Sequence, residues 1–206
     1  MDISSIILAG GKSLRFGYNK IVETVGQGNL LSQVISCVST LCREIIIVTR
    51  QEQVLPDLTD FPEVKIVTDI IPDKGPLGGI YTGLVKSPTF YNLVVAADMP
   101  FLNRSLLNYM LSVSAGSDIV MPTMNNQFEP LHAIYSRNCM APAADLIRQN
   151  RLFVLELFDL VKTRYVSAEE IDRFDPKHLS FFNINTTNDL KQARKLARGE
   201  IDNDKR

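Results

Sequence analysis

Residues 6 to 20 read IILAGGKSLRFGYNK, and the organisation of the chain follows from this stretch. Its apolar start stops at the paired glycines Gly10 and Gly11, a pattern typical of a buried strand that runs into a tight turn. Glycine permits positive φ angles and lets backbone N–H groups approach a ligand closely. Three cations follow in the same stretch, namely Lys12, Arg15 and Lys20. The combination favours a loop that binds an anion of high charge, such as a polyphosphate.

Two well-known phosphate loops do not fit these residues. A Walker A loop needs a glycine five positions before Gly11, where this chain has Ile6. The dinucleotide fingerprint G-x-G-x-x-G fails because Gly10 and Gly11 are adjacent and position 15 is Arg15. A plain turn between a strand and a helix, with solvated charges, is the alternative without a ligand.

The composition bounds the class of protein. The chain has 206 residues, of which 45% are apolar and 22% are charged, and such values are ordinary for a soluble globular protein. We expect one domain spanning residues 1–206. The net charge of −1 argues against a nucleic-acid partner, and no apolar run approaches the ~20 residues of a membrane span. Three cysteines without a C-x-x-C pair suggest a reducing cytoplasm.

Strand and helix patterns alternate along the chain, which predicts an α/β fold. Residues 44–49, EIIIVT, form a β-branched run typical of a parallel strand covered on both faces. Further strands are expected at 64–69, 91–98, 118–122, 128–136, 163–167 and 181–185. Helices are expected at 30–42, 80–86, 105–113, 141–149, 154–160 and 187–197. We therefore expect a Rossmann-like three-layer sandwich with a mostly parallel central sheet.

Two carboxylates are expected at the same edge of this sheet as the glycine turn. Asp69 ends one predicted strand and Asp98 ends another, VVAAD, and ligands of open α/β sheets bind beyond the carboxyl ends of the strands. A carboxylate at the end of a buried strand must be paired, cap a helix or bind a metal. For Asp98 a helix N-cap and a Mg²⁺ ligand are both open, and a nearby triphosphate loop favours Mg²⁺.

The stretch LAGGKSLRFGYNK resembles the nucleotidyltransferase signature L-A-G-G-x-S-x-R-[M/F]-G-x-[D/N]-K, in the form of the molybdenum cofactor guanylyltransferases. The resemblance implies that the loop binds the triphosphate of GTP and that Arg15 and Lys20 are its catalytic cations. The implied loop contacts with GTP are Leu8, Ala9, Gly10, Gly11 and Lys20. Removal of a phosphate-binding Lys20 should lower the rate sharply and leave the stability of the protein nearly unchanged.

Two more segments resemble motifs of the same family. AADMPFL resembles its metal-binding aspartate motif, which implies that Asp98 binds Mg²⁺ and contacts GTP. VTDIIPDKGPLGG resembles its D-x-x-x-D-x-G-P-L-x-G element, which implies that Asp69 contacts the nucleotide. The Asp69 carboxylate can accept hydrogen bonds from guanine N1–H and N2–H₂ or from a ribose hydroxyl. A turn residue beside Pro72 is the alternative without a ligand.

The acceptor side of the site is implied by two later segments. FEPLHAIYS resembles a family segment that faces the pterin, which points to Glu129 and His132. For His132, a packed strand histidine with a backbone partner is the alternative. FFNINTTNDL resembles the family element F-x-N-[IV]-N-T-P-E-[DE]-L and adds the amides Asn183 and Asn185, expected in a buried strand. Related nucleotidyltransferases often have a second metal-binding Asp at the position of Asn185, so Asp98 should be the dominant protein ligand of Mg²⁺.

The resemblance as a whole implies an enzyme that transfers GMP from Mg·GTP to the terminal phosphate of molybdenum-bearing molybdopterin and releases pyrophosphate. The attacking phosphate oxygen is already ionised, so no nucleophilic side chain is required. GTP, the molybdenum-bound molybdopterin and Mg²⁺ are then the expected ligands, and a weak contact with cofactor-delivering or acceptor proteins is left open. Cytidylyl transfer to molybdopterin, nucleotidyl transfer to a sugar phosphate and a non-catalytic nucleotide-binding module are the alternatives.

Overall fold

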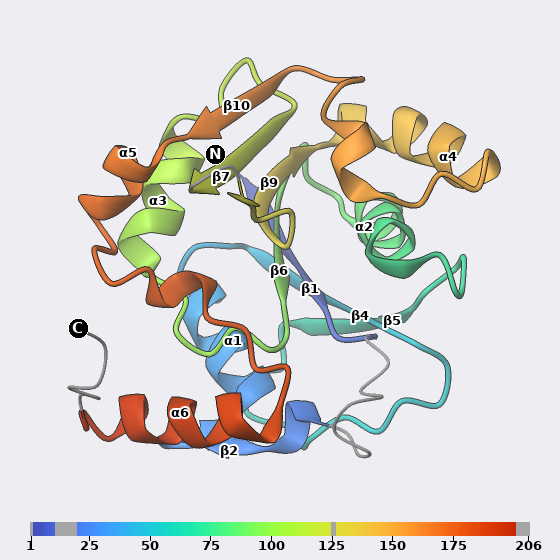
Figure 1. Cartoon of the computed structure of the whole chain (residues 1–206). Coiled ribbons are helices and arrows are strands. Elements are labelled where there is room, and N and C mark those ends of the chain that lie inside the picture. Colours follow the sequence, from blue (N-terminus) through green and yellow to red (C-terminus); the bar gives the residue numbers. More distant parts are fainter. Residues whose placement is uncertain (1, 11–19, 125–126, 201–206) are drawn as a thin grey trace.

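A computed structural model describes residues 2–10, 20–124 and 127–200 of the chain (Figure 1). In this part of the chain, eight strands form one sheet, and the antiparallel pair β2 (Thr24–Val25) and β3 (Gly28–Asn29) lies apart from it. Seven of the eight follow one another across the sheet as β10 (Thr163–Val166), β7 (Ile119–Met124), β9 (His132–Ser136), β6 (Tyr91–Ala96), β1 (Ile3–Leu8), β4 (Glu44–Thr49) and β5 (Val64–Thr68). The eighth, β8 (Gln127–Phe128), pairs with the end of β7.

The pairing in this sheet is mostly parallel, as predicted. The pairs β1–β6, β1–β4, β4–β5 and β7–β10 are parallel, and only β9 and β8 run antiparallel to their neighbours. Parallel neighbours need crossover segments, and these are the helices that cover the sheet. The described α-helices are α1 (Leu30–Val38), α2 (Gly75–Lys86), α3 (Arg104–Ser112), α4 (Met140–Arg148), α5 (Ala168–Asp172) and α6 (Thr187–Ala197).

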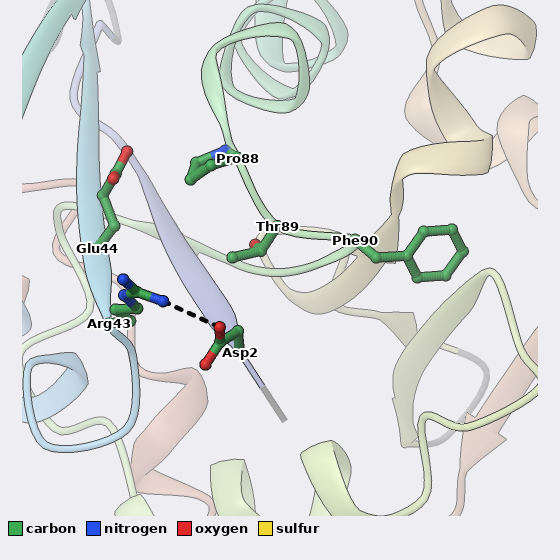
Figure 2. Close-up of a pocket in the computed structure, with 6 residues that line it drawn as sticks. All are labelled: Asp2, Arg43, Glu44, Pro88, Thr89 and Phe90. Atoms are coloured by element: carbon green, nitrogen blue, oxygen red, sulfur yellow. Dashed lines mark hydrogen bonds and ion pairs between the residues drawn. The ribbon is translucent and has the colours of Figure 1, made fainter.

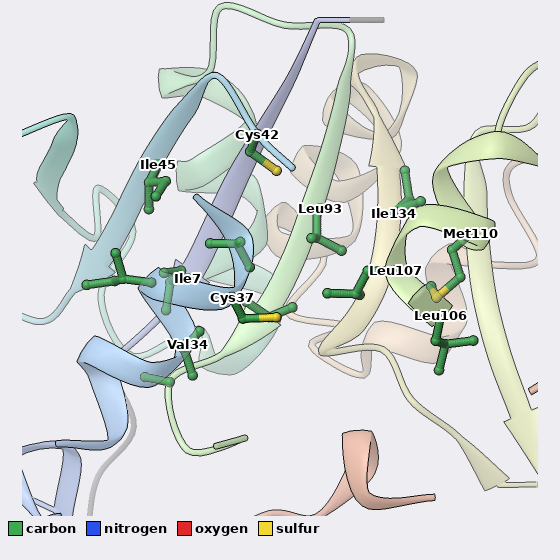
Figure 3. Packing of buried hydrophobic residues seen from close by; sticks show 14 of the residues in the cluster. Ile7, Val34, Cys37, Cys42, Ile45, Leu93, Leu106, Leu107, Met110 and Ile134 are labelled. Carbon is green, nitrogen blue, oxygen red and sulfur yellow. The ribbon is translucent and has the colours of Figure 1, made fainter. Parts of the chain in front are cut away.

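Helices lie on both faces of the sheet, which confirms the three-layer sandwich (Figure 1). One face carries Ile7, Ile45 and Leu93 against α1 and α3, as Figure 3 shows. The other face carries Ile6 and Ile46 against α2 and α4. Neighbouring residues point to opposite faces of a strand, so the continuous apolar run in the second half of β1 contributes to both cores. No helix of the described residues is long and apolar enough to cross a membrane.

Three predicted elements in the second half of the chain are shortened, divided or absent in the structure. Residues 154–160 contain only the 3₁₀ turn Val154–Leu157, which buries Val154 and Leu157 without a longer helix. Residues 128–136 are divided by a turn between β8 and β9. Residues 181–185 form no strand, because Ile184 makes a single backbone hydrogen bond to the Asp98 carbonyl (3.1 Å) instead of a ladder.

Helix α2 begins earlier than predicted and packs unusually close to β1. It starts at Gly75 rather than residue 80, because a proline in the first turn, Pro76, is compatible with a helix start. Gly79 lies over Leu8, and a Cβ on Gly83 would lie only 2.4 Å from Ile6 Cγ2. These two glycines are one helical turn apart and let the helix backbone approach the central strand.

We expect Gly83→Ala to lower the free energy of unfolding by about 1–3 kcal/mol, because the added methyl overpacks the contact with Ile6. Gly28→Ala is a matched control, since its added Cβ would meet only Ser32 Cβ at 3.8 Å. Urea unfolding of both variants and the wild type measures the difference. Equal stabilities of the two variants would contradict the close packing of α2 on β1.

Candidate functional site

The carboxyl ends of β1, β4, β5 and β6 lie at one edge of the sheet. Hydrogen bonds continue beyond the strands there: Ala9 N–H donates to Val48 O (2.9 Å) and Asp69 N–H donates to Thr49 O (2.7 Å). Ala97 N–H likewise donates to the Leu8 carbonyl at 3.1 Å. The predicted residues Leu8, Ala9, Gly10, Asp69 and Asp98 therefore share this edge, which we call the carboxyl edge.

The Lys20 ammonium and the Asp98 carboxylate form an ion pair at the carboxyl edge. Lys20 Nζ lies 2.5 Å from Asp98 Oδ2, and the two side chains are only 16% and 17% exposed. The same ammonium donates to the Ile184 carbonyl at 2.8 Å and to Asn185 Oδ1 at 3.4 Å. An ammonium has three N–H donors, so Lys20 commits all of them. Lys20 is thus not a solvated surface lysine.

Short segments hold this pair from three places in the sequence. Lys20 begins the 3₁₀ turn Lys20–Val22, and Asp98 follows β6 in a turn. Asn185 lies just before α6, whose N-terminus is fixed by a capping box between Thr186 and Asp189. Asp189 Oδ2 also accepts from Asn185 N–H at 2.9 Å, which fixes the backbone beside Lys20.

Asp98 keeps one carboxylate oxygen without a partner. Oδ1 is buried and accepts no hydrogen bond from any residue that the structure describes. The N-cap alternative for Asp98 is wrong, because Asn103 caps the following helix α3. A buried, unpaired carboxylate oxygen is costly unless a cation or donor meets it. Within the described residues no group of three or more His, Cys, Asp or Glu side chains gathers, so a cation here would need ligands from a substrate or water.

Asp69 is held in a turn by one of its oxygens. Oδ1 accepts from Thr82 Oγ1 at 2.7 Å and from Ile71 N–H at 3.0 Å. Thr82 Oγ1 in turn accepts from Ile70 N–H at 3.2 Å. The role of a turn residue therefore accounts for Oδ1 of Asp69. Oδ2 is left for other contacts. Thr82 carries no motif that would single it out in the sequence.

Gln53 is a second residue that the sequence analysis missed. Its Nε2 donates to the Ala9 carbonyl at 2.7 Å, and its Oε1 accepts from Arg50 N–H at 3.4 Å. The side chain therefore joins the end of β1 to the segment after β4. A Cβ on Gly10 would lie 3.2 Å from Arg50 N, so only glycine fits this close approach without adjustment. Loop residues without a motif give no sequence signal for such a contact.

His132 is a packed core histidine. It is fully buried, its Nε2 lies 2.7 Å from Ser180 Oγ, and its ring centroid is 4.7 Å from that of Phe181. Burial lowers the pKa of His132 from 6.5 to about 4, so the ring is neutral at pH 7. Its partner is a side-chain hydroxyl, whereas the alternative reading had expected a backbone group.

The other residues of the expected pterin side differ in their exposure. Glu129 is half-buried in the turn before β9, and desolvation raises the pKa of its carboxyl. Asn183 is half-buried and donates to the Phe181 carbonyl at 3.1 Å, while Asn185 is exposed. The prediction of two buried-strand amides is therefore wrong. Among the described contacts of these four residues, only that of Asn185 reaches Lys20. The predicted Gly11 and Arg15 lie outside the described residues.

A cavity of about 520 Å³ lies at the opposite edge of the sheet (Figure 2). Its lining comes from the amino ends of β1, β4 and β6 and consists of Asp2, Arg43, Glu44, Pro88, Thr89 and Phe90. Arg43 and Asp2 form an exposed ion pair at 3.0 Å across it. Because parallel strands send their carboxyl ends the other way, this cavity is separate from the carboxyl edge.

Comparisons with known proteins show which proteins the chain is similar to. A family model described as a MobA-like NTP transferase domain matches residues 5–161. A "Probable molybdenum cofactor guanylyltransferase" of Pelotomaculum thermopropionicum is 33% identical over 197 residues, covering 96% of this chain and 94% of the relative. A protein of the same description from Peptoclostridium acidaminophilum is 32% identical, covering 98% and 93%. The crystal structure of molybdopterin-guanine dinucleotide biosynthesis protein A from Archaeoglobus fulgidus has a TM-score of 0.82 at 27% identity, covering 95% and 99%.

We expect Lys20→Ala to lower the free energy of unfolding by about 1–3 kcal/mol, because it leaves the Asp98 carboxylate poorly solvated and unpaired. This differs from the expectation drawn from the sequence, in which the removal of a phosphate-binding Lys20 leaves the stability nearly unchanged. Adding Asp98→Ala should cost less than the sum of the single changes. The exposed pair Arg43–Asp2 is the matched control and should show no coupling. Urea unfolding of the variants in both double-mutant cycles measures these free energies. Additive changes in the free energy of unfolding for Lys20→Ala and Asp98→Ala would contradict the pairing.

We expect the free energy of unfolding to fall as the pH drops from 6.5 to 4, with a contribution of about 3 kcal/mol from His132. The unfolded chain binds a proton at the ordinary pKa of histidine, whereas the folded protein binds it only near pH 4, so acid favours unfolding. His132→Gln should remove this component, and the exposed His178→Gln should retain it. Urea unfolding at several pH values measures both. A His132→Gln profile parallel to that of the wild type would refute the assignment.

Proposed function

This chain belongs to the family of MobA-like NTP transferase domains, and we propose that it is a molybdenum cofactor guanylyltransferase. It transfers GMP from Mg·GTP to the terminal phosphate of molybdopterin that carries molybdenum, and it releases pyrophosphate. The observation that carries the proposal is the mostly buried Lys20–Asp98 pair at the carboxyl edge, with one carboxylate oxygen that has no partner among the described residues.

The chemistry between two phosphates explains this small set of groups. The acceptor phosphate is an ionised nucleophile, so the protein needs no activated serine or cysteine. What remains is to hold donor and acceptor in line and to neutralise charge that develops on the phosphoryl oxygens. A fixed ammonium and a carboxylate that can bind a cation supply these two functions.

Lys20 is suited to bind a phosphate through one exchangeable donor. Its contact with Asn185 Oδ1 is the longest of the three at 3.4 Å, and Asn185 is exposed. A phosphate oxygen can replace that acceptor while Asp98 and the Ile184 carbonyl keep the ammonium in place. Lys20 then stabilises the charge that grows as the bond to pyrophosphate breaks.

Asp98 fits a magnesium site. Mg²⁺ prefers one or two carboxylates together with substrate phosphates and waters, and Asp98 Oδ1 is a buried oxygen that lacks a partner among the described residues. We propose Asp98 as the dominant protein ligand. When bound, Mg²⁺ neutralises charge on the phosphates of GTP. Lys20 fixes the orientation of the carboxylate through Oδ2.

The other predicted site residues are assigned to the phosphate loop and to the pterin side. We propose that Gly10, Gly11 and Arg15 bind the phosphates that leave, and that Leu8 and Ala9 set where the loop starts, since their carbonyls are held by Ala97 and Gln53. Asn185, Asn183 and Glu129 are proposed to face the pterin, with His132 supporting that side from the core.

Residues near the two ends of the described chain lie in one hydrophobic cluster. We propose a single nucleotidyltransferase domain over residues 1–206, because α6 near the end of the chain packs Leu190 against Val25 and Leu30 near its start. Buried free thiols at Cys37, Cys42 and Cys139 fit a reducing cytoplasm. We propose that contacts with proteins that deliver or accept the cofactor are weak.

We expect Asp98→Asn to reduce Mg²⁺-dependent turnover roughly 10²–10³-fold, because an amide cannot replace the charge of the carboxylate. Pyrophosphate release is measured with Mg²⁺, molybdenum-bearing molybdopterin and each of GTP, CTP and ATP. Asp145→Asn, in an exposed ion pair on α4, is the matched control and should retain full turnover.

The same assay separates the alternatives. Release with CTP and not with GTP would overturn guanylyl transfer in favour of cytidylyl transfer. Release only when a sugar phosphate replaces molybdopterin would change the acceptor. Nucleotide binding without release in any mixture would indicate a binding module, and an active Asp98→Asn enzyme would exclude Asp98 as the metal ligand.

A further inference from the structure

The two oxygens of the Asp69 carboxylate have different surroundings. Oδ1 accepts two hydrogen bonds, from Thr82 Oγ1 at 2.7 Å and from Ile71 N–H at 3.0 Å. Oδ2 accepts none from the described residues. A carboxylate oxygen has two lone-pair positions, so Oδ1 is saturated by the protein itself. Only Oδ2 remains for a nucleotide.

Gly78 of α2 lies beside Oδ2 of Asp69. A Cβ on Gly78 would lie 3.5 Å from Asp69 Oδ2 and 3.1 Å from the Ile71 carbonyl, so any larger residue would press on this turn. Asp69 itself is half-buried, at the carboxyl edge after β5. Oδ2 is therefore the one oxygen of this carboxylate that accepts no hydrogen bond from the described residues.

Asp69 could contact either the guanine edge or a ribose hydroxyl, and these two contacts need different numbers of acceptor oxygens. The N1–H and N2–H₂ groups of guanine lie side by side and are matched by two parallel acceptors, as in a bidentate carboxylate pair. A ribose hydroxyl donates one hydrogen bond and needs one oxygen. The saturated Oδ1 leaves Asp69 suited to the second contact.

Resting on the proposed function, we infer that Thr82 is a positioning residue that limits Asp69 to one free oxygen, so that Asp69 binds a ribose hydroxyl of GTP and does not read the guanine edge. Thr82 is fully buried in α2 and cannot touch the nucleotide itself. Its hydroxyl accepts from Ile70 N–H while it donates to Asp69, which fixes the direction of that donation. Selection of guanine then lies with other groups of the site.

The test is the binding of GTP, ITP, 2′-deoxy-GTP and 3′-deoxy-GTP in Mg²⁺ by calorimetry, without any acceptor. The wild type should bind at least one deoxy analogue roughly 10- to 100-fold more weakly than GTP, the loss of one hydrogen bond to a charged group. Asp69→Ala should abolish that difference and leave the ratio of GTP to ITP affinities unchanged. A deoxy ratio that persists in Asp69→Ala, or a GTP/ITP ratio that collapses, would overturn the inference.

Variants of Thr82 test the positioning role. Thr82→Val removes the hydroxyl at nearly constant volume and should reduce the discrimination against the deoxy analogue, whereas Thr82→Ser should restore it. Thr49→Val is the matched control, because Thr49 is also buried at the carboxyl edge and its hydroxyl donates to Val67 O (3.4 Å), not to Asp69. Discrimination in Thr82→Val equal to that of the wild type and Thr49→Val would refute the role of Thr82.

The same titrations keep the two proposals apart. CTP and ATP are included for the wild type, and a preference for one of them over GTP would overturn the proposed function without bearing on Asp69. The deoxy analogues of the preferred nucleotide then replace those of GTP, and the ribose comparison proceeds with the same variants and the same deciding outcomes.

Discussion

The candidate site depends on the burial of β1 between two parallel neighbours. Ile6 and Ile7 are fully buried, one in each core, so both faces of the strand must be covered by helices. Covering helices require crossover connections, and crossovers make β4 and β6 run parallel to β1. Parallel strands send their carboxyl ends to one edge, which places Gly10, Asp69 and Asp98 together. The hydrophobic run before the glycines thus determines where the charged groups lie.

The Lys20–Asp98 pair shows how a charge can be buried and still remain available. Desolvating both groups is costly. The ion pair between them and the hydrogen bond from Lys20 to the Ile184 carbonyl together offset much of that cost. Asp98 Oδ1 is left without a described partner, and the third donor of Lys20 has a long contact. A cation bound at Asp98 Oδ1 would satisfy an acceptor that has no described partner, and a phosphate bound to Lys20 would replace its weakest hydrogen bond. Binding at these two positions therefore stabilises the site most.

The sequence predicted the elements that follow from local pattern and missed those that depend on contacts across the fold. β-branched runs such as EIIIVT and the ends of apolar runs located the strands and the carboxyl edge. The contacts of Thr82 with Asp69 and of Gln53 with Ala9 join residues 13 and 44 positions apart, and no local pattern encodes them. Asn185 was expected in a strand because FFNIN is apolar and polar in alternation, yet one hydrogen bond from Ile184 to Asp98 fixes an irregular backbone there.

The order of strands gives the carboxyl edge two unlike halves. On one side of β6 lie β1, β4 and β5, all parallel, with Gly10 and Asp69 at their carboxyl ends. On the other side β9 runs antiparallel, so its amino end, with the half-buried Glu129 just before it, reaches the same edge. Ligands of open α/β sheets bind where the strand order reverses, which in this sheet is between β1 and β6. Asp98 follows β6 and therefore lies beside that point. There it would help to neutralise charge on the α-phosphate as GMP passes from a nucleotide on one half to an acceptor on the other and pyrophosphate leaves.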